Sequence, residues 1–401
     1  MKSTHLVPAL IAILLVTVML LGGVIYAQSL ERRYVHALAT LHLDLNLQGS
    51  ALQKEAFRQP DLLPVYGSSE TTDYSTDYSA QEFFRAYPTG FATFEVGGGG
   101  MSCLNIAQQI AAIGPDIRGK KVIISFTPTM FQKEMVITEE YAFLFSRLHA
   151  NELIFSPYLS LAVKQAAAQR MLAYPTTLDK EPLLHFTLDK LAHDSLFNRA
   201  LYYLVWPLGR LWTLVLELQD HWETTKLIWA QGDLMPVVTR QPAAIDWPAL
   251  VAKAEQEQIP YANNNPFGFD NKIWLKKFSD QIMYKSPDAD GVVMAQLQQS
   301  AEWIDLEILL QVLKELDAQP LLLSRPINAT YWEEMGVTAA ARQTYYNKLR
   351  QLAASYNIPV VDFQEHEYDK YFSIDSVSHT SRKGWVYVNK TLDDFYHGIL
   401  R

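Results

Sequence analysis

The hydrophobic pattern of the chain opens with an uninterrupted apolar run. From Leu6 to Ala27 every residue is apolar or nearly so, and at 1.5 Å per residue a helix of that length spans roughly 33 Å, enough to cross the hydrocarbon layer of a bilayer. A cleaved signal peptide is the alternative, but Ile25-Tyr26-Ala27 is a weak cleavage site and the run is longer than a usual signal core. We therefore predict a retained membrane anchor over residues 1–30.

The pattern beyond the anchor alternates between two kinds of element. Residues 31–58 contain no glycine or proline before Gly49, which predicts a helical stalk. Short apolar runs bounded by turn residues are typical of buried parallel strands, and they occur at Leu62–Tyr66, Phe91–Val96, Val122–Phe126, Pro320–Ser324 and Pro359–Phe363. Helical patterns separate or follow them, at Gln81–Ala86, Asn105–Ile113, Leu306–Leu316, Thr338–Tyr356 and Gly384–Tyr396. This alternation predicts an α/β domain over residues 59–401, with a parallel sheet covered by helices on both faces.

Between about residues 135 and 300 the alternation stops. The sequence there is helix-like and rich in aromatic residues, so we predict an α-helical insertion in the α/β domain. Ala200–Leu218 is apolar enough to suggest a second membrane span, but Pro207, Gly209 and Arg210 lie at its middle, where a charge is costly. We interpret this segment as a helical pair that is buried or skims the membrane, and docking to a membrane partner remains open.

Composition removes several classes of partner. The formal net charge of −9 and the absence of long Lys/Arg runs argue against nucleic acid, because non-specific binding depends on neutralising phosphates. A polyanionic polymer would also gain no long-range attraction and would need local contacts. The single cysteine, Cys103, excludes an intrachain disulfide and a cysteine-based zinc site. We interpret it as a small core residue rather than a catalytic thiol.

Candidate chemistry appears where the first predicted strand ends. The strand is followed by Gly67-Ser68-Ser69-Glu70, and the carboxyl ends of parallel strands are where catalytic groups collect. Gly67 gives the backbone the freedom for a tight turn that exposes a serine hydroxyl. Because Gly-Ser-Ser is also a common structural turn, a nucleophile here requires a base nearby.

The candidate base is His379, which follows the last predicted strand and is preceded by Asp375. An aspartate close to a histidine orients the ring and stabilises the imidazolium that forms when a serine proton is taken. Four glycines at positions 97–100 follow the second strand. Their amides can approach a developing oxyanion, although a glycine run of this kind is also typical of a flexible loop. The chain contains no phosphate-loop, dinucleotide, His-Glu-x-x-His or Gly-x-Ser-x-Gly motif.

The order of these motifs resembles that of the SGNH (GDSL-like) hydrolases, which have a three-layer, flavodoxin-like parallel sheet. The resemblance narrows to the DltD family, the D-alanine transfer proteins of teichoic-acid D-alanylation, over residues 60–135 and 260–400. The matching blocks are Leu-Pro-Val-Tyr-Gly-Ser-Ser-Glu at 63–70, Asn-Asn-Pro-Phe-Gly-Phe-Asp-Asn-Lys at 264–272, Ser-Ala-Glu-Trp-Ile-Asp at 300–305, Arg-Pro-Ile-Asn at 325–328, and Glu-Tyr-Asp-Lys-Tyr-Phe at 367–372. Each block alone is weak, whereas together they are specific.

Carried over residue by residue, the resemblance implies a catalytic set. Ser69 matches the nucleophile, with Ser68 as the alternative, and His379 matches the family histidine. The oxyanion would be stabilised by the amides of Ser69 and Gly100, with Gly97 as the second choice for the glycine.

Two positions depart from the family pattern. The family's aspartate usually lies three residues before its histidine, where this chain has Ser376, and Asp375 lies one residue further back. Either the loop carries an extra residue and Asp375 still reaches the ring, or the orienting acid is different or missing. Residues 127–131 read Thr-Pro-Thr-Met-Phe in place of Ser-Pro-Gln-Trp-Phe, which leaves the acyl and acceptor specificity open.

The resemblance also implies a function and a location. The globular domain would lie outside the cytoplasm and transfer D-alanyl groups to teichoic or lipoteichoic acid through a serine acyl-enzyme. A membrane-bound O-acyltransferase and an acyl-carrier protein would be its partners, and neither a metal nor an organic cofactor would be needed. The few charges flanking the anchor do not determine its orientation. Two alternatives remain: a polysaccharide O-acetyl esterase or acetyltransferase on the same scaffold, and a non-catalytic membrane scaffold.

Overall fold

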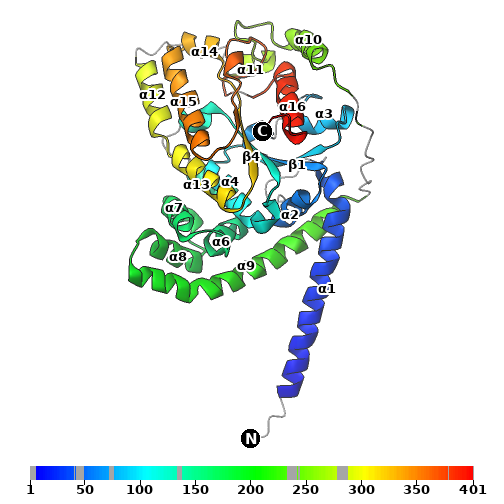
Figure 1. The fold of residues 1–401 in the computed structure, drawn as a ribbon, viewed down its shortest axis with the longest axis vertical. Coiled ribbons are helices and arrows are strands. Elements are labelled where there is room, and N and C mark those ends of the chain that lie inside the picture. The colour runs from blue at the N-terminus through cyan, green and yellow to red at the C-terminus, as the bar shows by residue number, and fades with distance from the viewer. Residues whose placement is uncertain are drawn as a thin grey trace.

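The centre of the molecule is a five-stranded sheet in which every pair of neighbouring strands is parallel. The computed structural model describes residues 6–39, 41, 49–71, 76–132, 138–232, 242, 244–277, 288–377 and 379–400. The sheet has the order β2-β1-β3-β4-β5 (Figure 1), with β1 (Leu62–Gly67), β2 (Ala92–Gly97), β3 (Lys121–Phe126), β4 (Gln319–Ser324) and β5 (Val360–Val361). This is the flavodoxin-like strand order. The predicted α/β class with a parallel sheet is confirmed, although the edge strand β5 is shorter than predicted.

Helices make up most of the remaining described chain. Those before β3 are α1 (Leu6–Ala39), α2 (Ser50–Arg58), α3 (Ala80–Ala86) and α4 (Cys103–Ile113). Between β3 and β4 lie α5 (Thr138–Leu144), α6 (Arg147–Phe155), α7 (Leu161–Met171), α8 (Pro182–Ala192), α9 (Leu196–Ala230), α10 (Trp247–Gln258), α11 (Asn271–Lys277), α12 (Ala289–Gln299) and α13 (Glu302–Glu315). After β4 come α14 (Ala329–Glu334), α15 (Ala339–Ser355) and α16 (Arg382–Tyr396).

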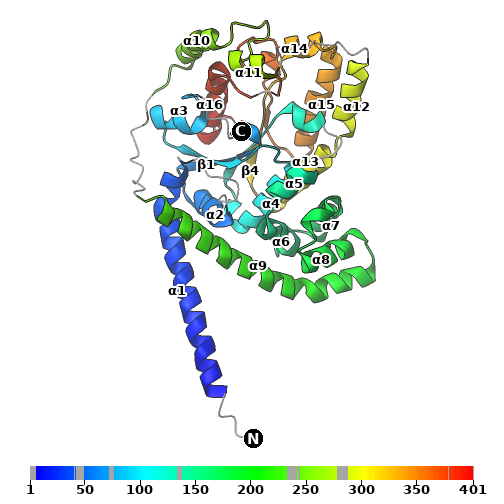
Figure 2. The same cartoon turned by 180° about the vertical axis from the view of Figure 1, so that it is seen from behind.

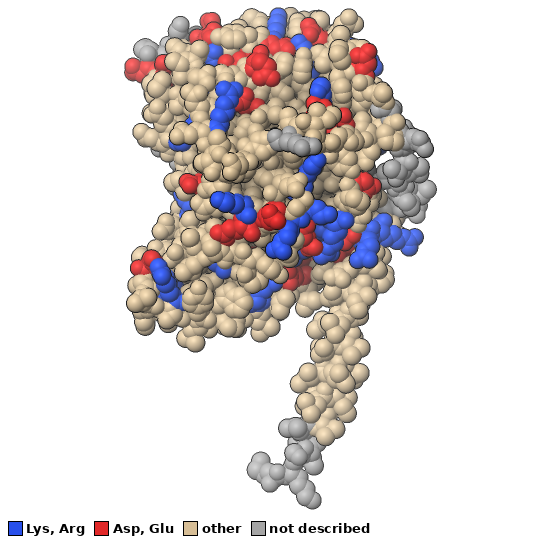
Figure 3. Space-filling model, viewed as in Figure 1, with Lys and Arg blue, Asp and Glu red and all other residues tan. Residues whose placement is uncertain are grey.

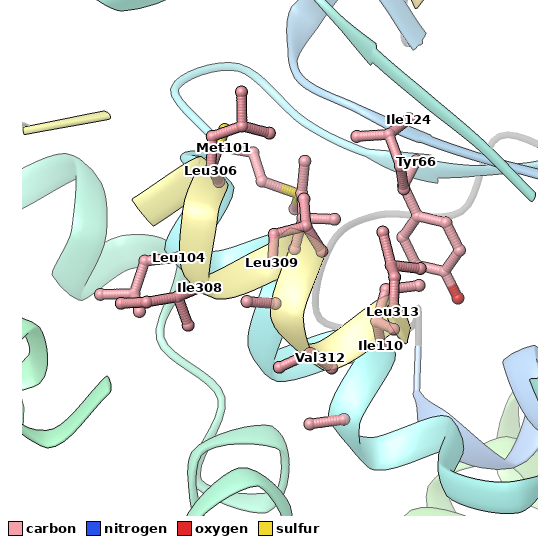
Figure 4. Packing of buried hydrophobic residues seen from close by; sticks show 14 of the residues in the cluster. Tyr66, Met101, Leu104, Ile110, Ile124, Leu306, Ile308, Leu309, Val312 and Leu313 are labelled. Atoms are coloured by element: carbon pink, nitrogen blue, oxygen red, sulfur yellow. The ribbon is translucent and has the colours of Figure 1, made fainter. Parts of the chain in front are cut away.

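The two faces of the sheet bury separate cores, because successive residues of a strand point to opposite faces. In β3, Val122 and Ile124 join the core that α4 and α13 complete, whereas Ile123 joins the core formed with α3 and α16. Figure 4 shows the first core, in which Ile110 of α4 and Leu309 of α13 are fully buried. Helices on both faces therefore keep the sheet away from water and leave its ends accessible.

The strand order places a crevice at one end of the sheet. After β1 the chain adds β2 on one side of it, and it then crosses back to add β3 on the other side. In an open α/β sheet, ligands bind outside the carboxyl ends of the strands at the point where the order reverses. Here that point is flanked by Ser68 and Ser69 after β1, and by Thr127 after β3.

Helix α1 projects from the globular part as one long helix (Figures 1 and 2). Val7–Ala39 is the one helix of the described residues that is long and apolar enough to cross a membrane, and its most apolar section has no residue buried in the protein. Figure 3 shows this section free of charged side chains. The predicted anchor and the first part of the predicted stalk are thus one element, whereas α2, at the end of the predicted stalk, is mostly buried in the globular part. Residues 1–5, 40 and 42–48 of these two predictions lie outside the described residues.

The region between β3 and β4 contains helices and irregular segments but no strand in its described residues. Its residues 135–137, 233–241, 243 and 278–287, which fall in the predicted insertion, lie outside the described part. The helical pair predicted around Ala200–Leu218 is wrong, because α9 is a single helix of 35 residues with Pro207 inside it. A Cβ at Gly209 would lie 2.1 Å from the ring of Phe155, so this glycine allows α9 to lie directly on α6. Contact along its length keeps α9 continuous where proline removes one hydrogen bond.

Candidate active site

The turn after β1 owes its shape to two glycines. A Cβ at Gly97 would lie 2.4 Å from the carbonyl oxygen of Gly67, and one at Gly67 would lie 3.2 Å from that of Ser125. The carboxyl ends of three neighbouring strands therefore approach more closely than side chains would permit. The chain then enters a short 3₁₀ turn, Ser69–Thr71, which places Ser69 at the crevice.

The structure brings three of the predicted site residues together. The hydroxyl oxygen of Ser69 lies 2.8 Å from Nε2 of His379, and Nδ1 of His379 lies 2.6 Å from a carboxylate oxygen of Asp375. Asp375 is 2% exposed. Although Ser69 and His379 are 310 positions apart in the chain, β1 and the loop before α16 end at the same edge of the sheet. The three side chains have the connectivity of a nucleophile, a base and an acid that orients the base.

The loop that carries the histidine accommodates the unusual spacing of its aspartate. The N–H of Ile374 donates to the carbonyl oxygen of His379 at 2.8 Å, which closes the loop at its base. Inside it, Oδ1 of Asp375 accepts the N–H groups of Val377 and His379 at 3.0 and 3.1 Å, while Oδ2 faces the ring. Ser376, at the family's usual position for the acid, hydrogen-bonds a tyrosine of α14. Of the two possibilities raised by the sequence, the structure has the one in which Asp375 reaches the ring.

A buried carboxyl group packs against the turn that carries Ser69. Glu70 is 1% exposed, and its Oε1 accepts the N–H of Ser68 at 3.0 Å. Burial raises the pKa of Glu70, while backbone hydrogen bonds and the charges of Arg325 and His379 oppose that rise. The guanidinium of Arg325 in turn lies 5.1 Å from the centre of the Trp385 ring. These packed groups restrain the backbone on which Ser69 stands.

A pocket of about 220 Å³ opens beside Ser69. Its wall is formed by Ser68, Ser69, Gly100, Met101, Ser102, Thr127, Thr129, Met130, Glu140, Glu302 and Val377. Gly100 has a positive φ of 85° and lies two residues before Ser102, which caps the amino terminus of α4. The positive end of that helix therefore points toward the pocket.

The two alternative site residues occupy different surroundings. Gly97 is the last residue of β2, packs against Gly67 and does not contribute to the pocket wall. The hydroxyl of Ser68 donates to the carbonyl oxygen of Gly98 at 3.3 Å, whereas the hydroxyl oxygen of Ser69 lies 2.8 Å from Nε2 of His379. The geometry thus favours Ser69 over Ser68 and Gly100 over Gly97.

Two carboxyl groups also face the pocket, Glu140 from α5 and Glu302 from α13. Burial and, as the next largest cause, the nearby carboxylate of Asp305 together raise the pKa of Glu302 to about 8. Glu302 accepts the N–H of Cys103 at 3.0 Å. Cys103 itself is fully buried and burial raises the pKa of its thiol, which fits its interpretation as a core residue. Among the described residues, no three His, Cys, Asp or Glu side chains converge as a metal site would require.

The block at 264–272 holds the histidine loop rather than lining the pocket. Oδ1 of Asn265 accepts two N–H groups of its own loop. A Cβ at Gly268 would lie 1.7 Å from the carbonyl oxygen of Lys370, so the two loops touch through their backbones. The N–H of Asp270 then donates to the carbonyl oxygen of Ile374 at 2.9 Å. This block is a positioning element for the loop that carries Asp375.

Sequence reasoning assigned no role to three residues that the structure places at the site. Glu70 and Glu302 lie inside the matching blocks of the family. Glu70 directly follows Ser69, and Glu302 begins the buried helix α13, so these neighbours could have indicated that both residues lie at the site. Glu140 lies in none of these blocks, and only the fold shows that α5 reaches the pocket.

The described chain is thus an α/β protein with a parallel sheet that carries a serine, a histidine and an aspartate in hydrogen-bonded order at its carboxyl edge. Its amino-terminal helix is long and apolar enough to be a membrane anchor. The family model described as "DltD protein" matches residues 41–397, and the chain belongs to this family. It is 27% identical to Protein DltD of Bacillus subtilis (strain 168) over 350 residues, which cover 87% of this chain and 86% of that protein. It is 23% identical to Protein DltD of Staphylococcus aureus (strain NCTC 8325 / PS 47) over 353 residues, or 87% and 84% of the two chains. The predicted family is confirmed, and the match supports a role in D-alanine transfer.

Proposed function

We propose that this protein transfers D-alanyl groups to teichoic or lipoteichoic acid outside the cytoplasm, through an ester of Ser69. Family membership supports the D-alanyl part of the proposal. The observation that carries the serine mechanism is the 2.8 Å approach of the Ser69 hydroxyl to a histidine that is itself held by Asp375.

The proposed reaction has two steps. In the first, the Ser69 oxygen attacks the carbonyl carbon of the D-alanyl donor while Nε2 of His379 takes its proton and passes it to the leaving group. In the second, His379 takes the proton of an acceptor hydroxyl, the acceptor oxygen attacks the ester, and the proton returns to the Ser69 oxygen as the bond to it breaks. Asp375 stabilises the imidazolium in both steps. The amides of Ser69 and Gly100, two residues that line the pocket, stabilise the oxyanion.

The chemistry of the pocket agrees with an acyl group that carries an ammonium. Glu140 and Glu302 both face the pocket, but burial and the neighbouring carboxylate of Asp305 raise the pKa of Glu302 and so favour its neutral form. We therefore assign the ammonium contact to Glu140. An acetyl group has no charge that would use this contact, which is why D-alanyl is preferred to acetyl in the proposal.

The partners in the proposal are those that the resemblance to the DltD family implies. A membrane-bound O-acyltransferase would deliver the acyl group to the domain side, from an acyl-carrier protein on the opposite side. The anchor α1 would keep the domain within reach of that delivery. The second candidate is a non-catalytic membrane scaffold that only binds its partners. That function would not explain the contact between Ser69 and His379.

Mass spectrometry of the intact full-length protein tests the proposal. The protein is exposed to a D-alanyl or an acetyl thioester, with His379→Ala included to trap an ester that the wild type would discharge. We expect a mass increase equal to one D-alanyl group in the wild type or the trapping variant, and none in Ser69→Ala. Ser68→Ala is the matched control and should still be labelled. Labelling that survives in Ser69→Ala, or a clear preference for the acetyl donor, would contradict the proposal.

A further inference from the structure

Exposed large apolar side chains gather on two helices, α1 and α9. On α1 they belong to the apolar section that is long enough to cross a bilayer. On α9 they occur along the whole helix, from Leu196 at its first residue to Trp229 near its last. Soluble surfaces seldom expose a continuous apolar patch of this kind unless something covers it.

Leu196, Tyr203 and Leu214 lie on the adjoining side of α9, and the other seven of its ten exposed large apolar side chains form one stripe. Their spacing follows the helical repeat, with successive steps of three, four or seven residues, so they share one face of the helix. Each is between 36% and 74% exposed, and the stripe consists of Phe197, Leu204, Leu208, Leu211, Val215, Trp222 and Trp229. At 1.5 Å per residue the helix is roughly 50 Å long, so the stripe extends well beyond the width of a local packing contact.

The opposite face of α9 is firmly attached to the domain. The hydroxyl of Tyr202 donates to the carbonyl oxygen of Ile154 at 3.0 Å, and Arg210 pairs with Glu152 at 2.8 Å. Thr213 and Leu216 are buried on this side. The charge of Arg210, which argues against a membrane span, is therefore paired with Glu152 inside the protein. The exposed charges of α9 include Arg199 in its first turn and the Glu223–Lys226 pair in its last turns, whereas the middle of the helix exposes apolar side chains.

The position of α9 identifies what covers that face. In both Figure 1 and Figure 2, α9 lies along the side of the globular part from which α1 projects. The rings of Tyr26 and Trp229 are 6.4 Å apart, so the carboxyl end of α9 meets α1 where its apolar run ends. Aromatic side chains at such a level are typical of the boundary between acyl chains and headgroups. The side chain of Arg32 lies just beyond this level on α1; it is 71% exposed although its Nε is 3.7 Å from a carboxylate oxygen of Glu55, and anionic headgroups would attract it.

We propose that the outer face of α9 lies in the bilayer surface, as a second membrane contact beside α1. The occupant of the stripe is lipid, at the boundary of headgroups and acyl chains, and α9 rests in the plane of the membrane without crossing it. A single crossing helix leaves the domain free to rotate about that helix and to tilt. A second contact roughly 50 Å long removes both freedoms and holds the pocket in one orientation toward the membrane. This inference depends on α1 being inserted and is independent of the chemistry at Ser69.

Site-specific fluorescence on the full-length chain tests the proposal. Because Cys103 is fully buried, the unsubstituted chain serves as the labelling blank, and Leu208→Cys carries an environment-sensitive probe. Val292→Cys on α12 is the matched control, since Val292 and Leu208 are 52% and 57% exposed and Val292 lies on the far part of the domain. Leu14→Cys on α1 reports insertion. Each labelled protein is placed in vesicles of phosphatidylcholine and phosphatidylglycerol that contain lipids with a quencher near the headgroup end of the acyl chain.

We expect quenching at Leu208 to be several-fold stronger than at Val292, with Leu14 also quenched. Adding Leu204→Glu and Leu211→Glu should abolish the quenching at Leu208 while the melting temperature in detergent stays unchanged, since both side chains are exposed. Quenching at Leu14 together with equal values at Leu208 and Val292 would overturn the proposal. The proposal would also be overturned if the probe at position 208 reported an apolar environment in native membranes but never in pure lipid vesicles, because a membrane protein would then cover the stripe.

Discussion

The Ser69 pocket and the outer face of α9 are the two parts of this molecule whose exposure calls for an explanation, and they are built in opposite ways. At the pocket, polar side chains from distant parts of the chain are oriented by hydrogen bonds. The Asp375 carboxylate, for example, accepts two backbone N–H groups and contacts Nδ1 of His379. On α9, consecutive turns of one helix expose apolar side chains. The first arrangement depends on directional contacts and tolerates little change. The second depends on the total apolar area that the helix exposes, so a single substitution on this face should change membrane contact and stability only slightly.

The largest effect is expected at the nucleophile. Ser69→Ala removes the atom that would carry the acyl group, and transfer should fall by roughly 10⁶-fold, as for serine enzymes whose nucleophile is removed. Steady-state transfer of D-alanine to a teichoic-acid acceptor measures the effect. Ser68→Ala, whose hydroxyl contacts Gly98, should retain most of the activity. Equal losses of transfer activity in the two variants would mean that activity depends on the conformation of the turn and not on the Ser69 hydroxyl.

The orienting acid should come next. Asp375→Asn keeps the size of the side chain but presents the wrong partner to Nδ1 of His379, so the ring would hold the wrong tautomer. Turnover should fall by roughly 10⁴-fold with little change in KM. Single-turnover rates and circular dichroism separate this from misfolding. A variant that folds and keeps wild-type turnover would show that Asp375 is not the acid of the site.

A matched pair of truncations contrasts buried packing with the open face of α9. Leu309→Ala in the core of α13 should lower the free energy of unfolding by about 2–5 kcal/mol, because it leaves a cavity. Leu211→Ala on the outer face of α9 removes the same atoms from a side chain that is 59% exposed, and should change stability by no more than about 0.5 kcal/mol in detergent. Thermal unfolding of both variants measures the difference. Similar losses would mean that the stripe is packed against protein.

The pH dependence of stability tests the buried carboxyl beside the pocket. Burial raises the pKa of Glu302 from 4.5 to about 8, so between these values the folded state binds a proton that the unfolded state releases. Stability should therefore fall as pH rises from about 4.5 to about 8. Glu302→Gln removes the titrating group, and its melting temperature should decline less over the same range. Parallel pH profiles in the two proteins would show that other groups cause the decline.

The smallest effect on transfer is expected at the acyl-binding contact. Glu140→Gln removes one partly exposed charge from the pocket wall. It should raise KM for a D-alanyl donor several-fold, since a single contact of this kind contributes about 0.5–1 kcal/mol, and should leave KM for an acetyl donor unchanged. An equal rise for both donors would assign Glu140 a structural role.

The fold could be predicted from the sequence because its signals are local. Short apolar runs bounded by turn residues identified β1 to β4 closely, and helical periodicity identified most of the helices that cover the sheet. The block around Ser69 and the loop of His379 were also visible, since both follow predicted strands. The length of α9 was not predicted, because Pro207 and Gly209 normally interrupt a helix. In this fold the missing side chain of Gly209 admits the ring of Phe155 instead, and that packing keeps the helix continuous.

By itself, then, the sequence determined the fold class, the family and the candidate residues, because periodicity and short motifs depend on neighbours in the chain. Tertiary structure decided which serine meets the histidine, that Asp375 reaches the ring from four residues away, and that Glu140 faces the pocket. It also decided that the apolar residues of α9 face outward on the side of α1. Each of these depends on distances between segments far apart in the chain, which only the folded backbone sets.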